Sequence, residues 1–268
     1  MWAGETSRCF SLKRVRLDQA LIVKKLCRSI AEAQQAIDER QISVNGAIAV
    51  SHGFMVAPSD ELLVMVREKY VSRGGFKLEA ALKNFRINLA DLRVLDVGAS
   101  TGGFTDCALQ HGARQIVALD VGKNLLHEKL RSDERVVEVS DTNARDLAKL
   151  FVANKPIFVK KFDAIVADVS FISLHEILPS ILTVLKTDGF LVLLVKPQFE
   201  ATRLEADKAS GIIEDPEIHR RVCREIGEAA SQLGCLLLGI IESPIRGQQG
   251  NREFLLGAKY THRHATTQ

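Results

Sequence analysis

The sequence has few cysteines, no long hydrophobic run and no signal-peptide pattern. Its five cysteines are odd in number and lack the paired spacing of metal ligands, which argues against a disulfide framework and a zinc site. The strongest apolar runs, Phe190–Val195 and Cys235–Ile241, are too short to span a bilayer, and the opening segment contains no apolar core. We therefore expect a soluble protein of the reducing cytoplasm that uses neither a metal nor a membrane.

Basic residues are gathered near the amino terminus, although the net charge of the chain is only +3. Between Arg8 and Arg28 there are seven basic residues and one acid, Asp18. Such a cluster predicts contact with a polyanion, and a solvated helix face is the plainer interpretation of the same pattern. A length of 268 residues with 46% hydrophobic content suits one large domain plus a small one.

The stretch Arg93–Asp106, RVLDVGASTGGFTD, has the pattern of a buried strand, a glycine-rich turn and the start of a helix. Unpaired backbone amides at such a helix start favour a carboxylate or a phosphate. A dinucleotide fingerprint requires glycine at the first, third and sixth positions, but the third position here is Ser100. The observed G-x-x-x-G-G spacing suits the amino-acid carboxylate of a ligand such as S-adenosylmethionine.

A second expected strand, Gln115–Asp120, ends in a carboxylate 24 positions after Asp96. A carboxylate at that place can accept both hydroxyls of an adenosine ribose. A glycine-rich turn by itself is also ordinary punctuation in α/β proteins. Because Asp120 accompanies the turn, the two features together indicate a nucleoside cofactor.

The amino-terminal region is predicted to form two short helices and a small β element. Apolar spacing indicates helices around Leu17–Leu26 and Ile30–Ile37, a strand and turn at Ile42–Gly46, and a strand at Glu61–Val66. The sequence motifs RLDQAL and SVNG resemble those of the S4 RNA-binding module. The resemblance implies RNA contact by basic side chains, and the candidates are Arg14, Arg16, Lys24, Lys25, Arg28 and Arg73.

Strand and helix signals alternate from residue 72 onward, which predicts a parallel sheet with helices on both faces. The expected fold is a Rossmann-like α/β domain with a seven-stranded, mostly parallel sheet. Ser72 is expected to cap its first helix. The predicted organisation is a tail at 1–13, an S4-like α+β domain at 14–66, a linker at 67–71 and the α/β domain at 72–268.

Apolar strands are expected to deliver polar residues to the edge where ligands bind in such sheets. Asp168 ends FDAIVAD, Lys196 ends FLVLLVK, and Glu253 opens the last strand, while Lys77 comes from the first helix. Each one alone is more easily explained as a surface or strand-end charge. Together they suggest a proton-transfer site. A lysine is a useful base only where its pKa of about 10.4 is lowered, and a neighbouring ammonium lowers it.

These four residues resemble the Lys-Asp-Lys-Glu tetrad of FtsJ-like RNA ribose 2′-O-methyltransferases. Six short sequence motifs accompany them, in this order along the chain: YVSRGGFKL, DVGASTGGFTD, DVSFISL, KPQFE, EDPEIH and GNREFLL. With the S4-like front end, they resemble the TlyA, or hemolysin A-like, family. The resemblance implies S-adenosylmethionine as methyl donor and a cytidine ribose in 16S or 23S ribosomal RNA, free or within ribosomal subunits, as acceptor.

The resemblance also implies a role for each member of the tetrad. Lys196 takes the proton from the 2′-hydroxyl while Asp168 and Glu253 hold it. Lys77 biases the protonation of Lys196 and positions the nucleotide. The residues expected around S-adenosylmethionine are Asp96, Gly98, Ala99, Ser100, Gly102, Gly103, Phe104, Asp120, Asn143 and Asp168.

Two rival classes remain. The family's second name raises a pore-forming hemolysin, for which the sequence shows neither a spanning segment nor a strongly amphipathic basic helix. The other is a non-catalytic ribosome-assembly factor with a degenerate pocket, against which the intact tetrad argues. Outside the tetrad, we expect surface or helix-end roles for His127, His175 and His219. We also expect a charged loop at Arg203–Lys208, either a mobile flap over RNA or an exposed connection.

Overall fold

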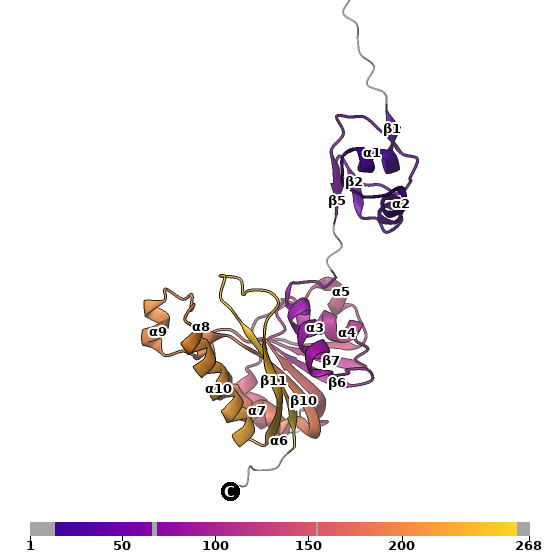
Figure 1. Cartoon of the computed structure of the whole chain (residues 1–268). Helices are drawn as coiled ribbons and strands as arrows, with labels where there is room; N and C mark the ends of the chain where they lie inside the picture. The colour runs from indigo at the N-terminus through magenta and orange to yellow at the C-terminus, as the bar shows by residue number, and fades with distance from the viewer. Residues whose placement is uncertain (1–13, 66–68, 154, 262–268) are drawn as a thin grey trace, which may run out of the picture. The chain divides into compact units, whose positions relative to one another are not determined.

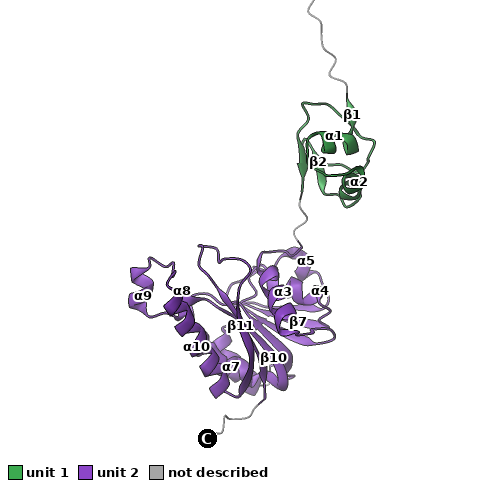
Figure 2. Cartoon of the chain, in the orientation of Figure 1, with its two compact units in different colours: residues 1–68 green, residues 69–268 purple. Residues whose placement is uncertain are grey.

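The computed structural model describes residues 14–65, 69–153 and 155–261. The expected tail at 1–13 and residues 67 and 68 of the expected linker lie outside this description. The chain divides into two compact units, residues 1–68 and 69–268 (Figure 2). Among the described residues, none of the helices combines the length and the apolar character needed to cross a membrane.

Unit 1 packs two helices against short strands. Its core contains Leu17, Leu21, Ile37 and Ile42, all fully buried. The elements are β1 (Val15–Arg16), α1 (Leu17–Val23), α2 (Ile30–Asp38), β2 (Ile42–Val44), β3 (Ala47–Ile48), β4 (Met55–Val56) and β5 (Leu62–Val64). They form a three-stranded sheet in the order β3-β2-β5 and a separate β1-β4 pair. Both predicted helices and both predicted strands are present.

Local sequence explains the turns of unit 1. Ser29 precedes α2, and its hydroxyl accepts a hydrogen bond from the backbone N–H of Glu32, which caps the helix. Asn45 and Gly46 join β2 to β3 with φ angles of 50° and 82°. Two consecutive residues with positive φ are what a tight type I′ hairpin requires, so the SVNG word encodes this hairpin.

Unit 2 is built on a seven-stranded sheet in the order β11-β12-β10-β9-β6-β7-β8 (Figure 1). Its strands are β6 (Arg93–Val97), β7 (Gln115–Leu119), β8 (Val136–Val139), β9 (Phe162–Ala167), β10 (Leu185–Val195), β11 (Cys235–Glu242) and β12 (Phe254–Tyr260). Strand β12 runs antiparallel to both of its neighbours, and the remaining pairings are parallel. The prediction of a mostly parallel sheet is therefore confirmed.

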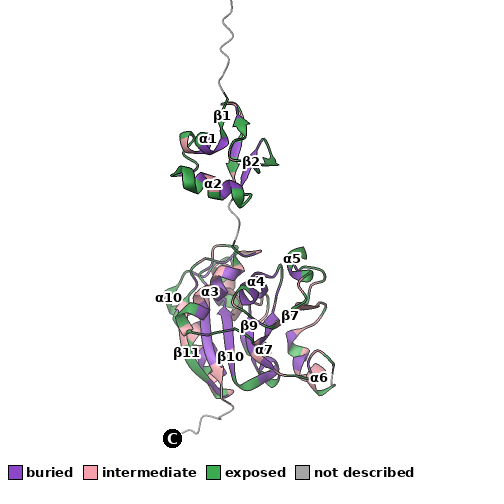
Figure 3. Ribbon diagram, turned by 90° about the vertical axis from the view of Figure 1, so that its right-hand side faces the viewer, coloured by how far each residue is buried: buried purple, intermediate pink, exposed green. Residues whose placement is uncertain are grey.

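Helices cover both faces of this sheet. The helical elements are α3 (Gly74–Phe85), α4 (Gly103–Gln110), α5 (Glu128–Arg131), the 3-10 turn η1 (Ala144–Asp146), α6 (Leu147–Val152), α7 (Leu174–Thr183), α8 (Pro197–Glu200), α9 (Arg203–Lys208) and α10 (Pro216–Gln232). Helices α3, α4 and α5 pack on one face, and α6, α7 and α10 pack on the other. The central strands lie buried between these layers (Figure 3). This burial is why they appear in the sequence as short continuous apolar runs.

Two local predictions were wrong. Helix α3 begins at Gly74 after Arg73, and no side chain caps it. Ser72 instead lies against Gly103, where an added Cβ would come within 2.2 Å of the Ser72 hydroxyl oxygen. The segment Arg203–Lys208 is a helix, α9, and it starts with a capping box in which Thr202 and Glu205 bond to each other's backbone N–H.

Candidate active site

The predicted site residues meet because several strands end at one edge of the sheet. Strands β6, β7, β9 and β10 are parallel, so the residues that follow them share the carboxyl edge. Strand β12 is antiparallel to β10, and its first residue, Phe254, pairs with Val195 at the end of β10. Lys196 follows Val195 and Glu253 precedes Phe254. Although Lys196 and Glu253 are distant in sequence, they therefore lie at the same edge of the sheet.

A cavity of about 510 Å³ occupies this edge. Its lining includes all four members of the predicted tetrad, Lys77, Asp168, Lys196 and Glu253. It also includes six other residues predicted from the sequence, Arg73, Gly98, Ala99, Ser100, Gly103 and Phe104. The structure therefore brings together charged residues from α3, β9, β10 and the approach to β12.

The tetrad consists of two lysine–carboxylate pairs. Lys196 Nζ forms an ion pair of 2.7 Å with Asp168 Oδ1 and donates a hydrogen bond of 2.7 Å to Ser170 Oγ. Lys77 Nζ lies 2.5 Å from Glu253 Oε2. The expectation that Glu253 holds Lys196 is therefore corrected, because Glu253 pairs with Lys77. The antiparallel entry into β12 aims its carboxylate at α3.

The pair of Lys77 and Glu253 is nearly inaccessible, with side chains 10% and 3% exposed. Burying two charges removes their hydration, and replacing a buried pair by apolar residues is often neutral or stabilising by about 1–4 kcal/mol. Removing only one partner instead costs roughly 3–5 kcal/mol. Because stability alone does not require the pair of Lys77 and Glu253, its presence at this cavity indicates a functional role.

A second cavity of about 400 Å³ lies beside the first. Its polar lining includes Asp120 and Asn143, and its apolar lining includes Leu119, Leu125 and Ile172. The two cavities share five lining residues, Gly98, Ser100, Asp168, Ser170 and Phe171. A ligand in the second cavity would thus adjoin the tetrad.

The glycine-rich turn forms the wall between the strand ends. Gly98 has a φ of 80°, and an added Cβ would come within 2.4 Å of the backbone oxygen of Asp168. Only glycine fits a left-handed conformation at such close approach. The backbone N–H of Ser100 donates to Asp120 Oδ2 at 2.8 Å, and that of Gly122 donates to Oδ1 at 2.8 Å. The turn and the acidic strand end therefore form one rigid unit.

Asp96 lies beneath this turn and is fully buried. The Thr105 hydroxyl donates to its Oδ2 at 2.6 Å, while Oδ1 has no hydrogen-bond partner. Burial raises the pKa of Asp96 to about 7. Asp96 was expected around S-adenosylmethionine, but it lines neither cavity, and its carboxyl is instead bonded to Thr105 in the first turn of α4.

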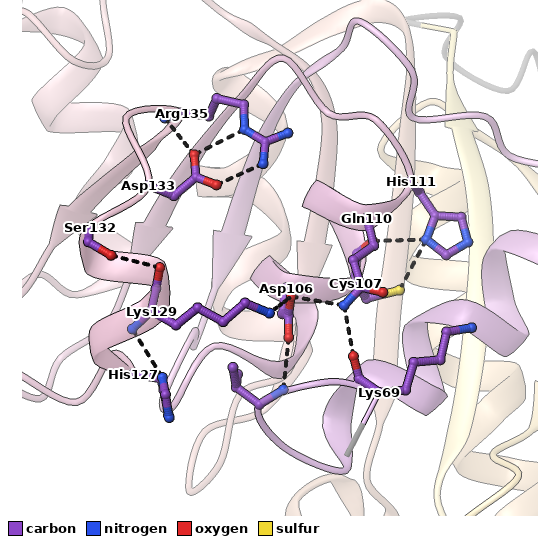
Figure 4. Close-up of polar contacts among 11 residues, drawn as sticks. Lys69, Asp106, Cys107, Gln110, His111, His127, Lys129, Ser132, Asp133 and Arg135 are labelled. Atoms are coloured by element: carbon purple, nitrogen blue, oxygen red, sulfur yellow. Dashed lines mark hydrogen bonds and ion pairs between the residues drawn. The ribbon is translucent and has the colours of Figure 1, made fainter. Parts of the chain in front are cut away.

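Residues 69–71, at the start of unit 2, are hydrogen-bonded to α4 (Figure 4). The N–H of Val71 donates to Asp106 Oδ2 at 2.8 Å, and Gln110 Nε2 donates both to the backbone oxygen of Lys69 and to Asp106 Oδ1. Lys129 lies 3.4 Å from the same carboxylate. This anchorage leads directly to Arg73, which lines the larger cavity. Lys69–Val71, expected as the end of the linker, belong to unit 2, and the predicted domain boundaries stay a prediction.

The cavities contain aromatic residues that were not predicted. Phe171 is 89% exposed, has a φ of 63° and lines both cavities. Its ring lies 5.1 Å from that of Phe199 at an angle of 49°. Glu200 holds α8 in place by accepting hydrogen bonds from the Ser173 hydroxyl and the Leu174 N–H, and burial raises its pKa. The motifs DVSFISL and KPQFE encode this arrangement, so an aromatic residue three positions after a charged strand end was the available signal.

The RNA candidates of unit 1 are exposed. Arg14, Lys25 and Arg28 lie open to solvent. Lys24 is also exposed and donates to the backbone oxygen of Asp60. Arg16 forms two hydrogen bonds with Asp18, at 2.7 and 3.1 Å, so its charge is partly compensated.

The residues present fit S-adenosylmethionine by their chemistry. The Asp120 carboxylate suits ribose hydroxyls, and the apolar side chains around it suit an adenine ring. The turn places glycines and the start of α4 where a carboxylate is favoured. Within the described ranges, no cluster of three or more His, Cys, Asp or Glu side chains could hold a metal ion.

Comparisons with known proteins agree with this architecture. The family model described as FtsJ-like methyltransferase matches residues 70–260, and the S4 domain model matches residues 15–62. Hemolysin A of Brachyspira hyodysenteriae is 40% identical over 242 residues, which cover 90% of this chain and 98% of that protein. The 16S/23S rRNA (cytidine-2′-O)-methyltransferase TlyA of Mycobacterium tuberculosis is 37% identical over 246 residues, with coverage of 91% and 89%.

A solved structure described as a candidate hemolysin from Streptococcus thermophilus is also similar. It aligns with a TM-score of 0.68 and 36% identity, and the match covers 94% of this chain and 90% of that one. The sequence resemblance, the sheet order and the family models thus agree. The chain belongs to the FtsJ-like methyltransferase family, in the TlyA group that joins an S4 domain to an S-adenosylmethionine-dependent methyltransferase domain.

Proposed function

We propose that this protein methylates the 2′-hydroxyl of a cytidine ribose in 16S or 23S ribosomal RNA. The observation that carries the proposal is the meeting of both lysine–carboxylate pairs in one cavity, next to the cavity that contains Asp120. The name of the Mycobacterium tuberculosis relative supports the choice of cytidine and of ribosomal RNA.

The second cavity would hold the nucleoside part of S-adenosylmethionine. Asp120 would accept its ribose hydroxyls, and Asn143 would lie near the adenine. Gly103 and the start of α4 would face the amino-acid part, whereas Gly102 lines neither cavity, and an added Cβ there would meet Leu126 and Leu130. When bound, S-adenosylmethionine supplies a methyl group on a positively charged sulfur, which is already a good leaving group.

Lys196 would take the proton of the 2′-hydroxyl. As a neutral amine Lys196 can accept that proton, and Asp168 and Ser170, each 2.7 Å from Nζ, fix its direction. A general base contributes typically 10²–10⁴-fold when it is held within hydrogen-bond reach of the proton. Lys77, fixed by Glu253, would add a second positive charge for the phosphate or ribose of the nucleotide.

Phe171 and Phe199 would hold the base of the acceptor nucleotide. Bases in a duplex are stacked and out of reach, so a nucleotide that reacts inside a cavity must leave its stack. Aromatic rings offer such a base a stacking surface worth about 1–3 kcal/mol. The exposed ring of Phe171 stands between the two cavities, next to the residues that would perform the transfer.

Unit 1 would supply affinity for ribosomal RNA or a ribosomal subunit, through its exposed basic residues and the S4 fold. A protein that acts on ribosomal RNA works where ribosomes are assembled, so we place it in the cytoplasm. The buried cysteines of the described part of the chain are compatible with that reducing environment.

Mass mapping of ribose methylation tests the proposal. Ribosomal RNA from cells with and without the protein should differ by one or more 2′-O-methylcytidines, and a plasmid copy should restore them. A copy with Lys196→Ala should not. Identical methylation in all strains, with RNA binding intact, would instead favour a non-catalytic assembly factor.

A further inference from the structure

Asn251 joins three segments around the tetrad and has no part in the function described so far. It is 1% exposed. Its Oδ1 accepts the backbone N–H of Ile213 at 2.9 Å, and its Nδ2 donates to the backbone oxygen of Gly211 at 2.8 Å. Its own backbone oxygen accepts the N–H of Gly247 at 2.9 Å. One side chain thus ties the turn after α9 to the loop before β12.

His219 supports the same turn from α10. It is 4% exposed, and its Nε2 donates to the backbone oxygen of Ile213 at 2.9 Å. Its ring packs against Phe254, with ring centroids 5.3 Å apart. Of the surface or helix-end role expected for His219, the surface alternative is therefore wrong, while the side chain does lie at the end of a helix. The EDPEIH word encodes this support, because Asp215 caps α10 and places His219 in its first turn.

Glu253 lies at the centre of this arrangement. It falls between Asn251 and Phe254 in the chain, and it is 3% exposed. Its Oε2 meets Lys77, while Oε1 faces Gly247 so closely that an added Cβ there would come within 2.4 Å. The carboxylate is therefore confined between a lysine on one side and a loop on the other, and Asn251 holds that loop.

We propose that Asn251, supported by His219, is a positioning residue that fixes Glu253 and through it Lys77. The inference rests on the proposed function, because it assigns the role through the methyl-transfer site. A buried amide whose oxygen and nitrogen are both hydrogen-bonded favours one geometry, and a catalytic group must be held within about 0.5 Å of its productive place. Asn251 supplies that constraint to Glu253, whose own strand begins only at Phe254.

A double-mutant cycle tests this role in the full-length protein. Asn251→Ala should lower single-turnover methylation of ribosomal RNA by about tenfold or more, the scale of a misplaced catalytic group. In a Glu253→Gln background the same change should cost less than about twofold, because residues that act through one another are not additive. Affinity for S-adenosylmethionine, measured by calorimetry, should be unchanged. Hydrogen exchange at the Ile213 amide should accelerate.

Ser180→Ala is a matched control. The Ser180 hydroxyl also accepts a backbone N–H, from Ala148, and donates to a backbone oxygen, that of Arg145, so it is a buried tether between segments. This variant should lower stability without lowering the methylation rate. His219→Gln keeps an N–H donor and should retain activity, whereas His219→Leu should repeat the Asn251→Ala result.

Equal rate losses for Asn251→Ala in both backgrounds would overturn the inference, as would no loss in either. Should Asn251→Ala fail to fold, the same cycle with His219→Leu decides by the same criterion. Absence of any methyl transfer by the wild-type protein to ribosomal RNA or subunits would instead reject the proposed function. The two failures are therefore distinguishable.

Discussion

The two units of this protein hold their functional charges in opposite ways. In unit 1 Lys24, Lys25 and Arg28 lie exposed on the surface. In unit 2 the side chains of Lys77 and Lys196 are each only 10% exposed, and each is paired with a carboxylate within 2.7 Å. Exposed charges attract a polyanion over a distance and are screened by salt. Paired and buried charges are held in position, so they should govern the rate of methyl transfer rather than the affinity for RNA.

The largest effect should come from Lys196. Lys196→Ala should lower single-turnover methylation by roughly a hundredfold or more while leaving affinities for S-adenosylmethionine and RNA nearly unchanged. Lys196→Arg should not rescue the rate, because a guanidinium stays protonated and cannot accept the hydroxyl proton. A wild-type rate for the arginine variant would make Lys196 an electrostatic group and would move the base elsewhere.

Removing the carboxylate of Asp120 should reduce cofactor binding. Asp120→Ala loses the acceptor for two ribose hydroxyls and frees the Ser100 and Gly122 amides. Hydrogen bonds to a charged group contribute about 1.5–3 kcal/mol, so affinity for S-adenosylmethionine should fall roughly ten- to a hundredfold in calorimetry. RNA affinity should not change. Unaltered cofactor affinity would show that the nucleoside lies elsewhere.

Reversing exposed charges in unit 1 should affect RNA binding alone. The double change Lys24→Glu and Lys25→Glu should weaken RNA affinity roughly tenfold and flatten its salt dependence. The rate at saturating RNA should be preserved. A matched control is Lys160→Glu with Lys161→Glu, which makes the same charge change at the amino end of β9, opposite the cavity edge. Equal losses of RNA affinity in both double variants would mean that RNA binding depends only on the total charge of the protein.

The smallest expected effect concerns the stability of unit 1. The hydrogen bonds from Arg16 lower the pKa of Asp18 to about 2. Because the folded pKa lies below the unfolded value of about 3.9, the pair stabilises unit 1 above that value. This contribution should be lost as pH falls from about 4 to about 2. Asp18→Asn should therefore speed hydrogen exchange of α1 at pH 5, and its difference from wild type should shrink towards pH 2.

Much of the fold was predictable because its central strands are buried on both faces. The buried strand expected at the start of Arg93–Asp106 is β6, and all five of its residues, Arg93–Val97, are buried. The two-residue strands of unit 1 were missed, because two residues carry no periodic signal. Helix α9 was taken for a loop because it buries no residue and so lacks an apolar stripe.

The tetrad was predictable as a set, whereas its pairing was not. Apolar strands followed by a charge marked Asp168 and Lys196. The partner of Glu253 depends on the antiparallel direction of β12, which the alternation of elements does not reveal. Asn251 and His219 were missed for a related reason, since their bonds join backbone atoms of segments far apart in the sequence.

The four cysteines in the described part of the chain should be chemically quiet. Burial raises the pKa of Cys107 to about 12 and those of Cys223 and Cys235 to about 11, and it also raises that of Cys27. The thiolate is the reactive form, so these side chains should resist maleimides at neutral pH. With Cys9 replaced by serine, one new surface cysteine in each unit would accept a dye pair selectively. Energy transfer between the dyes would then report whether the distance between the two units changes when RNA binds.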